Sequence, residues 1–166
     1  ASGGAGAPST GAPHSEDRTI IAATSGLLLQ LTSFLPESKL DMLNALAFKP
    51  SVLERLWEWI CCTRPQEKAA GGGYGDADPS LVTLFCLVYN YRLLTSDHSE
   101  FYERQYPFSL AAVREMVGVI KNIVVPLYWT QDQLSEPQLL LRNAGTALLS
   151  SLLERNCYRE FAPPME

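Results

Sequence analysis

Charged residues are scarce in this sequence, and they carry no strong bias of sign. Asp, Glu, Lys and Arg make up 19% of the 166 residues, and the formal net charge at pH 7 is −5. No basic stripe runs through the chain, so we expect no nucleic-acid partner, because binding to phosphates needs clustered Lys and Arg. Hydrophobic residues reach 46%, which is typical of a globular domain and not of a disordered chain.

Residues that commonly bind metals or act as nucleophiles are also few. The histidines are His14 and His98, and the cysteines are Cys61, Cys62, Cys86 and Cys157. No CxxC motif is present, and the adjacent Cys61 and Cys62 would point to different sides of a helix, so we expect no zinc site and no cofactor. No signal peptide is visible, and unpaired cysteines are typical of reducing compartments, so a cytoplasmic or nuclear location is expected.

The sequence has no apolar run long enough to span a bilayer. The most apolar stretch, LVTLFCLVYNYRLL, covers residues 81–94 and contains Asn90 and Arg92. A membrane-spanning helix needs about 20 predominantly apolar residues. We therefore expect no membrane partner.

Strand patterns are missing as well, and a helical period takes their place. Alternation of apolar and polar residues over more than four positions does not occur, whereas apolar residues recur every three or four positions in six stretches. We expect helices over about 17–34, 38–48, 50–62, 79–95, 109–128 and 135–156. Five to six such helices predict an all-α fold, as a helical bundle or as a fragment of an armadillo/HEAT-like solenoid.

Composition divides the chain into four segments. Residues 1–15 are rich in Gly and Pro and are expected to form a flexible linker, and residues 64–78 are expected to be a disordered Gly-rich insertion. N-terminal helices occupy 16–63, and a second helical region occupies 79–166. Asp78 and Pro79 predict a helix start, and Ser109 is placed to cap another.

The helices differ in how much of their surface is apolar. In 50–62, Val52, Leu53, Leu56, Trp57, Trp59 and Ile60 share one face. The two tryptophans could stack on a ligand, but a face shared with Val52 and Leu56 favours core packing. The stretches 79–95 and 135–156 are apolar nearly all round and are expected to be buried between neighbours.

The sequence contains no convincing catalytic constellation. Asp97, His98 and Glu100 could bind a metal, although so short a cluster is usually a solvated turn. Cys157 lies near Arg155 and Arg159, which would favour the thiolate, but no histidine accompanies it. We interpret both features as incidental.

An aromatic segment surrounds Pro107. Its members are Phe101, Tyr102, Tyr106 and Phe108, together with the later Tyr128. A connection with so many aromatic side chains must pack against something. It either fills a corner between two helices, which we favour, or forms a docking edge for a partner.

Two stretches resemble a known family. SEFYERQYPFSLAAVREMVGVIKNIVVPLYW at 99–129 and LLERNCYREFAPPME at 152–166 resemble the helical region immediately upstream of the catalytic domain in HECT-type ubiquitin-protein ligases, nearest to the branch called ubiquitin ligase 3B and 3C. The residues that match the first pattern are Phe101, Tyr102, Gln105, Pro107 and Phe108, and those that match the second are Arg159, Phe161, Pro163 and Pro164. The resemblance covers about 84–166.

This resemblance implies a function without catalysis in the chain itself. It implies a segment that continues into a HECT domain, whose catalytic cysteine would lie beyond Glu166, and that supports this domain or recruits substrates for ubiquitin transfer to lysine. The implied partners are the HECT domain in cis, substrate proteins and the ubiquitin-conjugation machinery. Candidate contacts to a partner or to that domain are Phe101, Tyr102, Tyr106, Phe108, Arg159 and Phe161. The alternative is a free-standing helical scaffold that binds peptides and is unrelated to ubiquitin.

Overall fold

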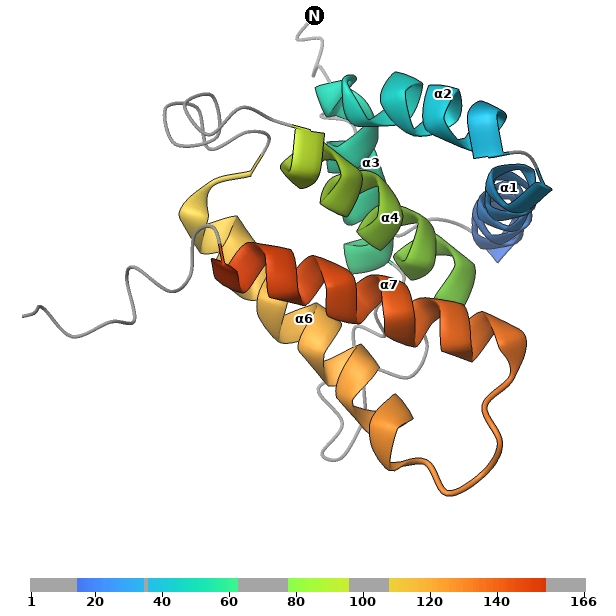
Figure 1. Ribbon diagram of the computed structural model, residues 1–166, viewed down its shortest axis with the longest axis vertical. Coiled ribbons are helices and arrows are strands. Elements are labelled where there is room, and N and C mark those ends of the chain that lie inside the picture. Colours follow the sequence, from blue (N-terminus) through green and yellow to red (C-terminus); the bar gives the residue numbers. More distant parts are fainter. Residues whose placement is uncertain (1–14, 35, 63–77, 96–107, 155–166) are drawn as a thin grey trace, which may run out of the picture.

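The computed structural model describes residues 15–34, 36–62, 78–95 and 108–154, which form six α-helices without a strand among them (Figure 1). The helices are α1 (Ser15–Phe34), α2 (Pro36–Ala47), α3 (Pro50–Cys62), α4 (Pro79–Thr95), α6 (Leu110–Trp129) and α7 (Glu136–Leu152). The all-α prediction is confirmed. The choice between a bundle and an armadillo/HEAT-like solenoid stays a prediction.

Helix α4 lies at the centre and contacts α1, α2, α3 and α7. Its residues 81–86 are all buried, as are Val88, Tyr89 and Leu93. The pattern of apolar residues on every side predicted this burial, because a helix without a polar face can be stable only between neighbours. The predicted start is also confirmed, since the Leu81 N–H donates to Asp78 Oδ1 at 2.9 Å.

Two hydrogen bonds between side chains hold α4 against its neighbours. The Tyr91 hydroxyl donates to Asn44 Oδ1 on α2, and the Ser151 hydroxyl donates to Asn90 Oδ1, both at 2.6 Å. The second bond joins the last turns of α4 and α7, and the first turns of these two helices also lie together (Figure 1). Helices α4 and α7 therefore run in the same direction.

The apolar face predicted for α3 is confirmed. Leu53, Leu56, Trp57 and Ile60 are buried, and Trp59 is half-buried against the core. The ring centroid of Trp57 lies 5.4 Å from that of Phe85 on α4. The two tryptophans thus contribute to core packing, as the shared face predicted.

Helix α6 begins and ends much as predicted. The Ala112 N–H donates to Ser109 Oγ at 3.2 Å, which confirms the cap. The helix ends at Trp129, three residues after Pro126, where the Thr130 hydroxyl donates to the Pro126 carbonyl at 2.9 Å. Five of its apolar residues face the core and are buried: Val113, Met116, Val119, Ile120 and Val124.

Two sequence-based expectations were wrong in detail. The helix expected over about 38–48 starts two residues earlier, with Pro36 as the first residue of α2, a position that suits proline because no N–H is needed there. Helix α7 is not buried all round, since Leu139 and Leu140 are exposed, as is Leu153 at its C-cap. The reason is its place at the surface, where, among the described helices, α4 and α6 alone make extensive contact with it.

The cap of the central helix leads to the first testable prediction. Replacing Asp78 with alanine should lower the free energy of unfolding by about 1 kcal/mol, because the Leu81 N–H loses its acceptor. Urea unfolding followed by circular dichroism measures this loss. Asp78→Asn keeps a capping oxygen and should retain most of the stability, whereas an equal loss in both variants would argue against the cap.

Candidate interaction surface

Of the candidate contact residues predicted from the sequence, only Phe108 belongs to the part of the chain that the structure describes. Phe101, Tyr102, Tyr106, Arg159 and Phe161 lie outside it, as do Asp97, His98, Glu100 and Cys157. Phe108 is 7% exposed and makes edge contacts with two rings of α4, with centroids 5.4 Å from Tyr89 and 6.2 Å from Phe85. Phe108 is therefore a core residue, and partner contacts by the other five stay a prediction.

The buried thiol of Cys86 is poorly placed for nucleophilic chemistry. Burial raises the pKa of the Cys86 thiol to about 12, so it is protonated at neutral pH, whereas catalysis requires the thiolate. Cys61, on α3, is only half-buried. Within the described helices and turns, no three or more His, Cys, Asp or Glu residues group together as metal ligands would.

A cleft of about 310 Å³ lies where α1 passes the first turns of α4 and α7. Its lining residues are Gly26, Leu29 and Gln30 from α1, Pro79, Ser80 and Thr83 from α4, and Glu136, Pro137 and Leu140 from α7. The volume is at the lower end of the range for ligand pockets. With one ionisable residue in its lining, the cleft lacks the ligand set of a metal site.

Three features of the fold shape the cleft. Helices α4 and α7 start side by side because they run in the same direction, and both carry a proline in the first turn. Hydrogen bonds to side chains already cap both helix starts. In α4 the acceptor is Asp78, and in α7 Gln138 Oε1 accepts from the Ser135 N–H at 2.9 Å. On α1, a Cβ built on Gly26 would meet no atom within 4 Å. The prolines make the mouth of the cleft largely apolar, and Gly26 leaves open space beside α1.

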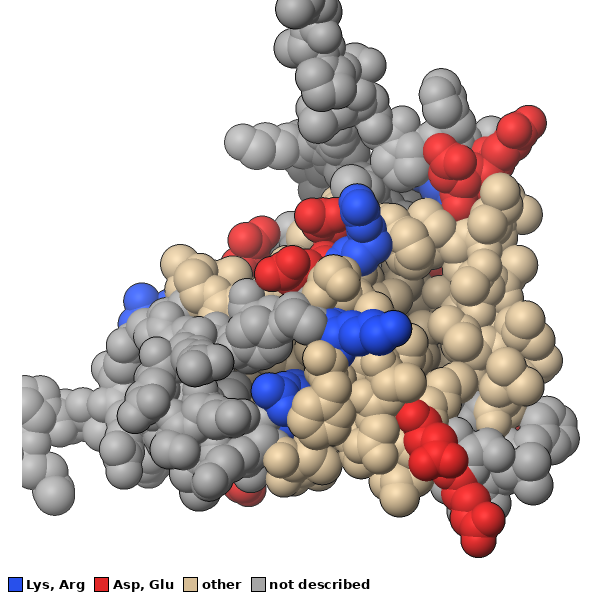
Figure 2. All heavy atoms as spheres, turned by 90° about the horizontal axis from the view of Figure 1, so that it is seen from above, with Lys and Arg blue, Asp and Glu red and all other residues tan. Residues whose placement is uncertain are grey.

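The outward face of α1 continues the apolar surface. Ile20 is 63% exposed, Leu27 56% and Leu31 53%, and at 100° per residue the three fall within an arc of about 40°. Residues 19–34 contain no charged side chain. Seen from above, the middle of the right-hand side of the molecule, on the side where α1 lies, is a broad area without Lys, Arg, Asp or Glu, and acidic residues lie above and below it in the view (Figure 2).

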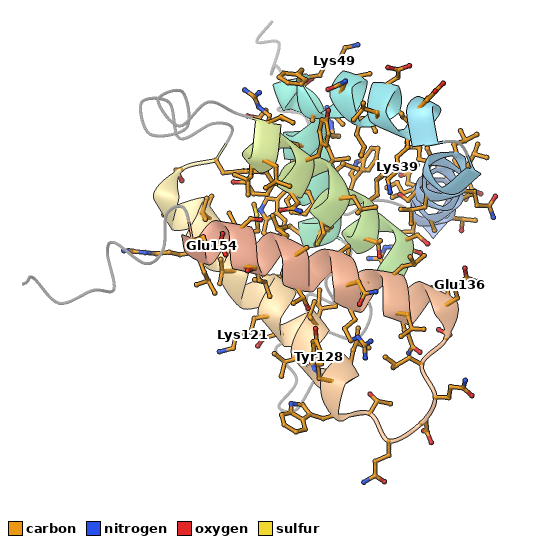
Figure 3. All side chains as sticks on the ribbon, viewed as in Figure 1. Lys39, Lys49, Lys121, Tyr128, Glu136 and Glu154 are labelled. Carbon is orange, nitrogen blue, oxygen red and sulfur yellow. The ribbon has the colours of Figure 1, made fainter. Side chains whose placement is uncertain are left out.

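Exposed aromatic side chains gather at the end of α6. The Arg142 guanidinium lies 5.2 Å from the centroid of the Tyr128 ring, whose hydroxyl shares a hydrogen bond of 2.6 Å with Thr146 Oγ1. Tyr128 is thus held between α6 and α7 (Figure 3). Trp129, at 80% exposure, is the most exposed large apolar residue that the structure describes.

Neither the cleft nor the exposed face of α1 was predicted from the sequence. The cleft depends on the direction of two helices that are distant in the sequence, which no local pattern encodes. The exposed face of α1 had a signal in the sequence, because Ile20, Leu27 and Leu31 fall together on the helical wheel, on a different side from Ser25 and Leu29, and no charge interrupts them. A surface helix normally carries charged residues on its outer side.

Comparison with known proteins relates the chain to ubiquitin ligases. No protein-family model and no solved structure matches it. None of the described helices is long and apolar enough to cross a membrane. The chain is 28% identical over 153 residues to the E3 ubiquitin-protein ligase UPL6 of Arabidopsis thaliana, covering 86% of this chain and 14% of that protein. It is 24% identical over 139 residues to the ubiquitin-protein ligase E3B of Mus musculus, covering 78% and 13%.

These matches reach well into the N-terminal half, where the sequence offered no recognisable motif. Coverage of 86% of the chain cannot be confined to residues 84–166, over which the resemblance was first noted. The chain spans about one seventh of the length of the curated relatives it matches. It is therefore similar to a short region of E3 ubiquitin-protein ligases from a plant and from the mouse.

Proposed function

We propose that the chain is a non-catalytic helical region of a HECT-type ubiquitin ligase, the parent protein, and that it supports the catalytic domain or recruits substrates to it. Its partners are then the HECT domain in cis, substrate proteins and the ubiquitin-conjugation machinery. In the parent, a catalytic cysteine outside this chain accepts ubiquitin as a thioester and passes it to a substrate lysine.

The observation that carries this proposal is the similarity of 86% of the chain to 14% of a plant ubiquitin ligase. The chemistry of the described residues agrees with a supporting role. Their fully buried thiol, that of Cys86, has a pKa raised to about 12 by burial and is shielded from any thioester. The apolar cleft and the uncharged face of α1 are instead suited to contact with protein.

The alternative, a free-standing helical scaffold that binds peptides, also has an observation in its favour. A cleft bounded by three helices is the kind of groove in which an amphipathic helix binds. The sequence of the complete gene distinguishes the ligase from the scaffold. An open reading frame that continues from this chain into a domain with a catalytic cysteine supports the ligase, and a frame without such a domain supports the scaffold.

We expect the chain alone to transfer no ubiquitin. Incubation with activating enzyme, conjugating enzyme and ubiquitin should give no adduct sensitive to reducing agent, because a buried, protonated thiol such as that of Cys86 cannot attack the thioester. The parent protein under the same conditions should form such an adduct. An adduct on the isolated chain that Cys157→Ser or Cys61→Ser abolishes would overturn the non-catalytic assignment.

A further inference from the structure

We propose that the cleft between α1, α4 and α7, together with the outer stripe of α1, is a docking groove for an α-helix from a part of the parent ligase outside these 166 residues. The inference rests on the proposed function, because it requires the longer parent. It adds the place of contact, the type of element that binds there and the residues that bind it.

The outer stripe of α1 has the spacing of a helix-packing seam. Ile20, Thr24, Leu27 and Leu31 follow one another at intervals of 4, 3 and 4 residues. This spacing keeps one row of side chains facing a neighbouring helix. All four residues are exposed in the chain alone. A packing seam that faces water leaves apolar surface to be covered by another element.

The cleft beside this stripe gives the incoming helix a place to insert a side chain. Gly26 and Gln30 line the cleft, and the stripe residues Leu27 and Leu31 directly follow them on α1. Gly26 leaves the space beside α1 open, so another backbone can approach closely there. Leu140 on α7 lines the opposite side of the cleft and is itself exposed. A helix lying along α1 would contact both walls.

The charge of the rim defines the chemistry of the partner. Glu136, at the end of α7 that lies toward α1, is the ionisable residue of the lining (Figure 3). The adjoining face of α1 is uncharged from residue 19 to residue 34. The docking helix therefore carries an apolar stripe toward α1, and a Lys or Arg on its flank can pair with Glu136.

A helix of the same parent fits this surface better than a second copy of the chain. Stable complexes between separate proteins bury about 800 Å² on each partner. The stripe presents three large apolar side chains, and its remaining member is the small Thr24. A small apolar seam suffices in cis, because linkage within one chain supplies a high effective concentration. The length of the curated relatives, about seven times that of this chain, leaves ample sequence for such a helix.

The test compares hydrogen exchange of α1 in the 166-residue chain and in the parent. We expect the α1 amides to exchange at least about tenfold more slowly in the parent, which corresponds to about 1.4 kcal/mol. Gly26→Met should remove this difference by filling the cleft, while the isolated chain should not be destabilised, because the new side chain meets no atom near its Cβ. Leu27→Glu tests the stripe in the same way, at a residue whose substitution cannot disturb the core.

Two controls define the outcome. Gly118→Met on α6 also adds a side chain where a Cβ meets no atom within 4 Å, and it should preserve the protection of α1. Gly26→Ala corrects for the change in helix propensity. Equal exchange in the two proteins, protection that survives Gly26→Met, or a dimer of the isolated chain that Leu27→Glu dissociates would each overturn the docking groove. Ubiquitin transfer by the parent is assayed separately, so that a failure of the ligase assignment is distinguishable from a failure of the groove.

Discussion

Replacing Phe85 with alanine is expected to lower the free energy of unfolding by about 3–5 kcal/mol. Phe85 is fully buried at the middle of an aromatic cluster, with ring centroids 5.4 Å from Trp57, 5.7 Å from Tyr89 and 6.2 Å from Phe108. Removing the ring leaves a cavity between α3, α4 and Phe108. Urea unfolding followed by circular dichroism measures the loss.

Trp129→Ala provides the matched control, because it also removes a large aromatic ring but at a site 80% exposed. Its effect should stay within about 0.5 kcal/mol. The double variant Phe85→Ala with Phe108→Ala should lose less than the sum of the two single variants, because the second truncation removes contacts that the first has already removed. A loss below about 1 kcal/mol for Phe85→Ala would contradict the central place of this cluster.

Gly145→Ala should also destabilise the fold, by about 1–3 kcal/mol, although alanine favours helices over glycine. Gly145 is buried on α7, and a Cβ there would collide with the side chain of Val124 on α6. Since Val124 is buried, it has little freedom to move away. The two helices are packed as closely as a glycine permits.

The collision makes a specific rescue possible. In the background of Val124→Ala, the colliding methyl group is absent, so Gly145→Ala should become neutral or stabilising. Gly118→Ala on α6 is the control for helix propensity alone, because its Cβ meets no atom, and it should stabilise by about 0.5–1 kcal/mol. A stabilising Gly145→Ala in the unmodified chain would show that α6 and α7 are separated more widely.

Most of the local structure could be predicted from the sequence because it depends on residues close together in the chain. The apolar face of α3, the caps at Asp78 and Ser109 and the burial of α4 all follow from spacing and residue type. The surroundings of α7 could not be predicted in this way. Its leucines occupy several faces, and only the placement of α4 and α6 decides that Leu141 is buried while Leu140 is exposed.

The candidate site was less predictable for the same reason. Aromatic composition drew attention to the segment around Pro107, of which Phe108 is a core residue in the structure. The cleft instead combines Gly26, Pro79 and Pro137, which are small or common in helix starts and carry no chemical signature. Such a cleft exists only where three helices come together. Its position could therefore be found from the three-dimensional structure but not from a sequence motif.

The pairing of α4 with α7 has a consequence for synthesis of the protein on the ribosome. The hydrogen bond between Asn90 and Ser151 joins residues 61 positions apart, and most of α7 follows α4 by a similar interval. At about 5–20 residues per second, the face of α4 that α7 covers emerges several seconds before its cover does. During that interval an apolar helix with no polar side is open to solvent on one flank. Chaperone binding to the nascent chain is therefore expected to begin when α4 leaves the exit tunnel and to end once α7 has emerged.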